Sequence, residues 1–291
     1  MRTQDVVDRV DPITRRWGPN VVRWTAGMLW LANVNWKWPP DFGRSGANCG
    51  GLCGYVQSGI DHPVLPGAPW LFEHVIRPNL GVFGWMTLLI EGSLAVLLLS
   101  GRYVRFAAVL GVVQSFAILV SVTNAPNEWY WSYLMMIALH IAVLTMVPTA
   151  RSQSASATAV AVTVLGAVVA IAHVGAGFTG DANTSWSVFA QDNSLPGDAG
   201  RNLFPGSIAI GLILIAVGTG GWYVATRVEA AQRRIVGWGL LAVSAVLFVT
   251  YRNGELGIGL GARITFVCAL AAVGLVLATS SESGGLTNPI S

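Results

Sequence analysis

Charged residues are scarce in this chain: Asp, Glu, Lys and Arg make up 11% of its 291 residues, against roughly a quarter in soluble domains. This shortage argues against an ordinary soluble protein. The basic residues are scattered, so the net charge of +3 does not indicate a nucleic-acid partner. The segment from Arg2 to Arg16 is polar and is not followed by a short apolar core with a cleavage site, so no cleavable signal peptide is expected.

Hydrophobic residues, by contrast, make up 53% of the chain and form long runs. A helix needs about 20 mostly apolar residues to cross the hydrocarbon core of a bilayer. Candidate spans cover residues 20–36, 81–100, 106–124, 131–148, 157–177, 206–225, 235–251 and 260–279. The sequence therefore predicts an all-α, polytopic membrane helix bundle with about eight transmembrane helices, surrounded by membrane lipid.

The placement of Lys and Arg predicts how these spans are oriented. With the N-terminus in the cytoplasm, eleven of the 17 Lys and Arg residues fall in cytoplasmic segments and six outside, so the positive-inside rule places both termini in the cytoplasm. Two long loops, 38–79 and 179–204, then lie outside, and 68–75 is expected to form a short surface helix. Chemistry and binding of other protein subunits are expected on these outer loops.

The chain divides near the serine-rich segment 152–156 into two halves, 1–150 and 151–291, each with four spans. The first half has loops rich in Trp and Pro and polar groups inside its spans. The second half consists mostly of Ala, Val, Leu and Gly. The candidate site is therefore sought in the first half.

Ionisable residues inside a membrane are energetically expensive and tend to mark functional sites. Glu91 lies about ten residues into the second span and His140 about nine into the fourth, which places them at similar depth because both helices start from the outer face. The two side chains are predicted to meet in the bundle. Gln114, in the third span, and Tyr133, on the same helix face as His140, add hydrogen-bonding groups.

The first span carries one further polar stripe, which ends in a cation near the outer face. It consists of Arg23, Gly27, Trp30, Val34 and Lys37. One interpretation is a cleft in which Glu91, His140 and Gln114 handle protons or bind a quinone headgroup, while Lys37, Arg44 and Arg77 attract an anion. The other is a polar network that only holds four helices together.

These residues resemble the DoxX/DoxD family over roughly the first half of the chain. The resemblance is carried by RWTAGMLWLANVNWK from Arg23, by PNLGVFGWMTLLIEGSLAVLLLSGRYVRFAAVLG from Pro78 and by EWYWSYLMMIALHIAVL from Glu128. The matching positions are Arg23, Gly27, Lys37, Glu91, Gly101, Arg105 and His140. The long Cys-bearing outer loop and the four additional spans are not part of the minimal family module.

The resemblance implies an N-terminal four-helix module and a function, because the family includes the membrane subunit of a thiosulfate:quinone oxidoreductase. The expected function is a membrane oxidoreductase subunit in the cytoplasmic membrane of a prokaryote. It would pass electrons from a small extracytoplasmic donor, such as thiosulfate, to membrane quinone. Glu91 and His140 would be catalytic, and Lys37, Arg77, Gln114 and Tyr133 would bind substrate or quinone. The alternative is a non-catalytic anchor or assembly subunit of a larger respiratory or cell-envelope complex.

Cysteine and the remaining histidines suggest few further sites. Cys49 and Cys53 frame the sequence CGGLC on the predicted outer side, where a structural disulfide is favoured over a redox-active dithiol. The pair lacks the two other ligands of a zinc site, and no metal is expected at His62 or His74 either. His173 lies at a different depth from His140, so haem is not expected.

Overall fold

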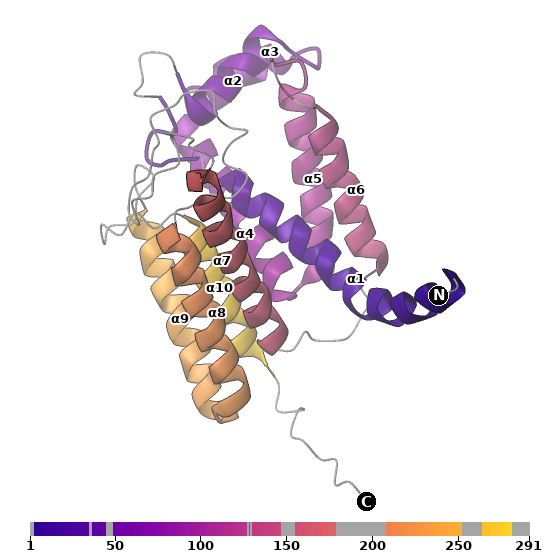
Figure 1. Ribbon diagram of the computed structural model, residues 1–291. Helices are drawn as coiled ribbons and strands as arrows, with labels where there is room; N and C mark the ends of the chain where they lie inside the picture. Colours follow the sequence, from indigo (N-terminus) through magenta and orange to yellow (C-terminus); the bar gives the residue numbers. More distant parts are fainter. Residues whose placement is uncertain are drawn as a thin grey trace, which may run out of the picture.

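The computed structural model describes residues 3–34, 37–44, 49–126, 128, 130–146, 155–178, 208–251 and 264–280, and their regular secondary structure is helical. The elements are α1 (Thr3–Val34), α2 (Gly51–Asp61), α3 (Ala68–Leu71), the π-helical turn η1 (Phe72–Ile76), α4 (Leu80–Ser100), α5 (Val104–Val122), α6 (Tyr130–Met146), α7 (Ala155–Phe178), α8 (Ile208–Arg227), α9 (Ala230–Thr250) and α10 (Ile264–Thr279) (Figure 1). The predicted all-α bundle is thus confirmed over this part of the chain.

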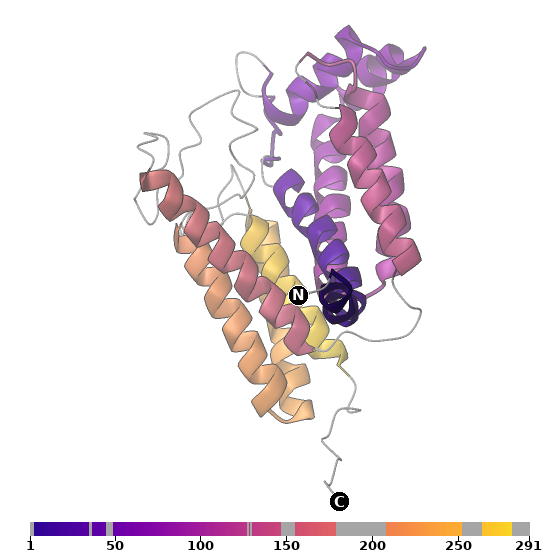
Figure 2. The same cartoon turned by 45° about the vertical axis from the view of Figure 1, so that its right-hand side comes forward.

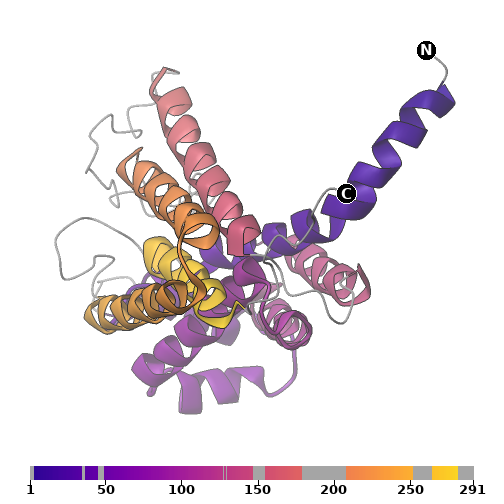
Figure 3. The ribbon, with the colours of Figure 1, turned by 90° about the horizontal axis from the view of Figure 1, so that it is seen from below.

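Each of the eight predicted spans overlaps one helix. Of the helices in the described residues, α4, α5 and α9 are long and apolar enough to cross a membrane, which indicates a membrane protein. The first span was predicted to begin at residue 20, whereas α1 begins at Thr3. A hydropathy pattern identifies only the apolar part of a helix. Polar residues also form helices, so α1 extends before the apolar run that the sequence showed. The first turns of α1 project away from the other helices (Figure 3).

The N-terminal helices α1, α4, α5 and α6 pack against one another, and α1 crosses α4 at an angle (Figures 1 and 2). Gly27 allows this close crossing, since a Cβ atom there would lie 2.9 Å from Cγ of Leu99. Small residues at a helix crossing let the backbones approach, which is how helices associate in lipid. The core of this unit includes Trp30, Leu88, Leu98 and Val143.

The C-terminal helices form two close pairs, α7 with α8 and α9 with α10. Glycines lie at both contacts: a Cβ atom at Gly166 would lie 2.6 Å from the Gly211 carbonyl oxygen, and one at Gly237 would lie 2.3 Å from the Ala278 nitrogen. Helix α10 is buried along most of its length and also packs against α4. The contact between α4 and α10 therefore joins the two groups of helices.

Helices α2, α3 and η1 lie across one end of the bundle, called here the loop end (Figure 1). They share a small apolar core with Phe42 and Leu80, and α3 with η1 confirms the predicted surface helix at 68–75. Gly84 makes room for the Phe42 ring, because a Cβ atom there would lie 2.4 Å from it. The opposite end is called the arginine end, because the helix termini there carry Arg102, Arg105, Arg227, Arg233 and Arg234.

Candidate functional site

A buried ion pair joins α1 and α4. Nζ of Lys37 lies 2.6 Å from Oε2 of Glu91, and the two side chains are 3% and 1% exposed. Lys37 also donates to the carbonyl oxygen of Asn33 at 2.8 Å. On the other side of the carboxylate, Nε2 of Gln114 donates to Oε1 of Glu91 at 3.3 Å. Both carboxylate oxygens of Glu91 therefore accept a hydrogen bond from another part of the bundle.

The local sequence explains why these groups meet. Glu91 shares the buried face of α4 with Thr87, Leu88 and Ala95, and its position eleven residues from Leu80 puts it about 16 Å along the helix. Lys37 follows the end of α1 at Val34 and folds back toward the bundle. A single buried charge would carry a large desolvation penalty, and a close, hydrogen-bonded partner offsets much of it.

The stripe on α1 carries the rest of the network. Arg23 is 1% exposed, and its Nη1 donates to the carbonyl oxygens of Leu98 and, at 3.0 Å, Leu99. These carbonyls belong to the last turn of α4, where a helix has no donors of its own and favours a positive charge. Thr158 of α7 donates to the same turn at 3.4 Å from the Leu99 oxygen. The stripe thus binds α4 at two levels, through Arg23 and through Lys37.

His140 is fully buried and binds a different member of the stripe. Nε1 of Trp30 donates to Nε2 of His140 at 2.9 Å, and Nδ1 of His140 lies 2.6 Å from the Met136 carbonyl oxygen. Nε2 accepts and Nδ1 donates, so this arrangement assigns the neutral tautomer with its proton on Nδ1. Gly111 of α5 leaves the space that the imidazole fills, because a Cβ atom there would lie 2.1 Å from Cδ2 of His140.

The structure does not bring Glu91 and His140 into direct contact through any hydrogen bond of the described residues. Each instead binds the N-terminal segment: Glu91 through Lys37, which follows α1, and His140 through Trp30 of α1. With both ring nitrogens engaged, His140 can transfer a proton only after one of these bonds breaks. His140 thus holds α1 in place through Trp30, and its catalytic role stays a prediction.

A second polar cluster lies at the loop end. Glu128, just before α6, accepts side-chain hydrogen bonds from Tyr55 of α2 and Tyr133 of α6. Burial, reinforced by the negative charge of Glu128, raises the pKa of Tyr55 well above its ordinary value, so that its hydroxyl stays a donor. Tyr55, Glu128 and Tyr133 thus form one hydrogen-bonded cluster near the start of α6.

The arginines predicted to attract an anion lie elsewhere on the surface. Arg77 is exposed at the end of η1, and Nη2 of Arg44 donates to its carbonyl oxygen at 2.5 Å. Lys37, predicted to act with them, is instead buried against Glu91, because its flexible stem folds inward to the nearest buried carboxylate. Its charge is compensated there by Glu91, and its anion-attracting role stays a prediction.

Sequence reasoning missed Glu128 and Tyr55, although one signal was available. Glu128 is the acidic residue that opens the EWYW segment in front of the fourth predicted span, and an acidic group is favourable at a helix N-terminus. Tyr55 carried no such signal, since its contact depends on how α2 folds over the bundle. Among the described residues, no group of three His, Cys, Asp or Glu side chains could hold a metal ion, and the side chain of His173 lies outside them.

Cys49 and Cys53 form a disulfide that closes the turn before α2, with Cα atoms 5.2 Å apart. The bond expected between these two cysteines is thus present, and its structural role stays a prediction. A loop this short restricts the unfolded chain by about 2 kcal/mol.

Replacing Cys53 with serine is therefore expected to destabilise α2 locally by about 2 kcal/mol, measured as faster amide hydrogen exchange in 51–61. Exchange in α10 should be unchanged, which makes that helix the internal control. Unaltered exchange in α2 would show that the disulfide contributes nothing to holding this cap.

Comparison of the chain with protein-family models, with curated proteins and with solved structures finds no match.

Proposed function

We propose that the protein is a membrane oxidoreductase subunit that passes electrons from a small donor at the loop end to a membrane quinone. Glu91 is the proton-handling residue, Gln114 and Tyr133 hydrogen-bond the quinone headgroup, and His140 positions α1 through Trp30. The observation that carries this proposal is the position of the Glu91 carboxylate. It is buried within an apolar bundle and bound by Lys37 and Gln114 from two neighbouring elements.

The electron and proton balance explains why such a residue is needed. Reducing a quinone to a quinol takes two electrons and two protons. Two thiosulfate ions that join through a new sulfur–sulfur bond release two electrons and no proton, so both protons must come from water. The cluster of Tyr55, Glu128 and Tyr133 lies at the loop end, and in this proposal those protons enter there. A carboxylate transfers protons most efficiently when its pKa lies near the operating pH, and burial and a neighbouring cation shift a carboxyl pKa in opposite directions.

The proposal includes the membrane topology that the sequence predicts: eight crossings in the cytoplasmic membrane of a prokaryote, with both termini in the cytoplasm. The five arginines named at the arginine end support this orientation. It also retains the resemblance of residues 1–150 to the DoxX/DoxD module, with 151–291 as a second four-helix unit. In this proposal, the Lys and Glu positions that resemble the family, Lys37 and Glu91, act together as one buried ion pair.

The test is quinone reduction by the purified protein in lipid vesicles, with thiosulfate as the donor. Glu91→Gln is expected to lower the rate at least about 100-fold in the protein that remains folded, the usual contribution of a positioned proton donor. The double variant Lys37→Met with Glu91→Gln leaves no buried charge unpaired, so it should show the same loss of rate with its thermal transition largely retained. Glu229→Gln removes an exposed carboxylate at the start of α9 and is the matched control. Thiosulfate-dependent reduction that survives unchanged in Glu91→Gln would refute the assignment.

A non-catalytic anchor or assembly subunit is the second candidate, and the loop end favours it. Leu65, Trp70, Leu71 and Val75 are each more than 40% exposed on or near α3 and η1. An apolar surface of this kind suits another protein subunit. Trp70→Asp should then abolish co-purification of that subunit, whereas Tyr103→Asp, at an exposed position of the turn between α4 and α5, should not. Absence of turnover together with such a partner would favour this function over the first.

A further inference from the structure

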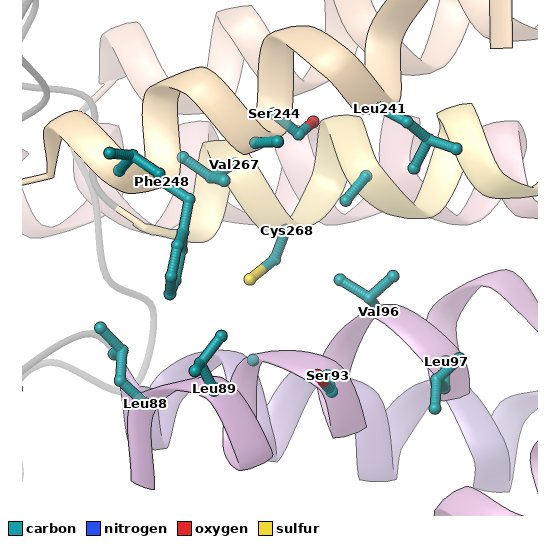
Figure 4. Close-up of a pocket in the computed structure, with 14 residues that line it drawn as sticks. Leu88, Leu89, Ser93, Val96, Leu97, Leu241, Ser244, Phe248, Val267 and Cys268 are labelled. Carbon is teal, nitrogen blue, oxygen red and sulfur yellow. The ribbon is translucent and has the colours of Figure 1, made fainter. Parts of the chain in front are cut away.

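An apolar groove of about 410 Å³ runs between the two groups of helices. Its walls come from α4 on one side and from α9 and α10 on the other, and Figure 4 shows Leu88, Val96, Phe248 and Cys268 projecting into it. Of the lining residues only Ser93 and Ser244 carry hydroxyls, and Ser244 donates to its own helix at the Leu240 oxygen. The groove thus offers apolar contacts and little hydrogen bonding, in a volume typical of ligand sites.

The shape of the groove fits a single hydrocarbon chain. Along α4 it extends from Leu88 to Leu97, which is about 14 Å at the helical rise per residue. One leaflet contributes about half of a hydrocarbon core roughly 30 Å thick. The groove is therefore long enough to hold an acyl chain along α4 through about the full thickness of one leaflet.

Cations lie beyond one end of the groove. Arg102 follows α4, and its Nη2 donates to the Val276 oxygen at 3.5 Å. Val276 is five residues, or about 8 Å, past the groove residue Ala271 on α10. Nε of Arg102 is buried and has no hydrogen-bond partner among the described residues. Arg102 thus combines a positive charge with an unused donor close to the apolar groove.

A second arginine lies beyond the same end on α9. Arg234 is seven residues before the groove residue Leu241, so the two share a helix face and are about 10 Å apart along the axis. Arg102 and Arg234 thus lie beyond the Leu97 and Leu241 end of the groove, on its two opposite walls. An apolar groove ending between two cations is complementary to an amphiphile with an apolar chain and an anionic head.

We infer that this seam is a binding site for one anionic phospholipid, with an acyl chain in the groove between α4, α9 and α10 and its phosphate near Arg102 and Arg234. The lipid fills the space between the two helical units where α4 and α10 meet. It would thereby link them, because each unit contributes both a wall and an arginine. Binding of this lipid involves neither Glu91 nor turnover. Failure of this inference would therefore leave the oxidoreductase proposal unaffected, and failure of that proposal would leave this inference unaffected.

The experiment counts lipids bound to the full-length protein by native mass spectrometry after addition of phosphatidylglycerol or phosphatidylcholine. We expect one tightly bound phosphatidylglycerol and weaker binding of phosphatidylcholine. Arg102→Gln and Arg234→Gln should each weaken phosphatidylglycerol about fivefold, since a cation near an anionic lipid surface contributes about 1 kcal/mol. Arg105→Gln, an exposed arginine at the same end, is the control and should leave binding unchanged.

The groove itself is tested separately from the charges. Ser93→Trp places a large ring in the groove and should displace the lipid, whereas Val113→Trp, at an exposed position of α5, should not. Equal binding of both phospholipids, no effect of either arginine variant, or displacement by inorganic phosphate alone would overturn the inference. Occupation of the groove by a quinone tail, insensitive to Arg102→Gln, would overturn it as well.

Discussion

Replacing Lys37 with methionine is expected to destabilise the protein by about 3–5 kcal/mol, the effect of leaving one member of a buried ion pair without its partner. The side chain of Glu91 is only 1% exposed, so water cannot replace the lost ammonium group. The remaining amide of Gln114 donates to one carboxylate oxygen alone. The change is measured as the shift in reversible unfolding of the purified protein in detergent micelles.

The matched double variant separates the ion pair from the space it fills. Lys37→Met with Glu91→Gln removes both charges while keeping side chains of similar size, so it should recover most of the lost stability. Arg77→Met removes an exposed cation and should change stability by less than about 0.5 kcal/mol. A Lys37→Met variant as stable as the parent protein would show that the pair is not buried as described.

Replacing Gly111 with alanine is expected to destabilise the protein by about 1–3 kcal/mol through overpacking. The new methyl group would lie 2.1 Å from Cδ2 and 2.2 Å from Nε2 of His140. The imidazole would have to move, and its hydrogen bond from Trp30 would be lost. Thermal unfolding measures the loss, and tryptophan fluorescence reports the altered surroundings of Trp30.

Gly92→Ala is the control, because its new methyl group would meet only Sγ of Cys268 at 3.8 Å. Alanine is a better helix former than glycine by up to about 1 kcal/mol, so this variant should be as stable as the parent or more so. Gly111→Ala combined with His140→Ala should be less destabilised than the sum of the single effects. Strict additivity of the two changes would contradict the contact between Gly111 and His140.

The helices could be predicted because their signal is local. An apolar run of 81–100 has few alternatives to a buried helix, and α4 spans Leu80–Ser100. The stripe from Arg23 to Lys37 was also visible, since helical periodicity places its members on one face. Hydropathy could not predict the polar beginning of α1, because the residues before residue 20 form a helix without being apolar.

The partners within the site could not be predicted in the same way. Depth along each helix placed Glu91 and His140 at one level, but depth does not specify rotation about the helix axis. The side chains therefore bind different residues of the N-terminal segment, Glu91 binding Lys37 just after α1 and His140 binding Trp30 within it. The position of Lys37 at the end of a span suggested a surface cation, whereas its long side chain reaches a buried carboxylate. Glu128 meets Tyr55 only because α2 folds over the bundle, a contact between segments far apart in the sequence.

The central claim is that Glu91 exchanges a proton when quinone is reduced in this bundle. Infrared difference spectroscopy of the protein in quinone-containing vesicles, recorded before and after reduction, tests it most directly because carboxylate and carboxylic acid absorb at different frequencies. The account predicts a carboxyl signal that is absent in Glu91→Gln and retained in Glu229→Gln. A spectrum of Glu91→Gln identical to that of the parent protein would contradict it.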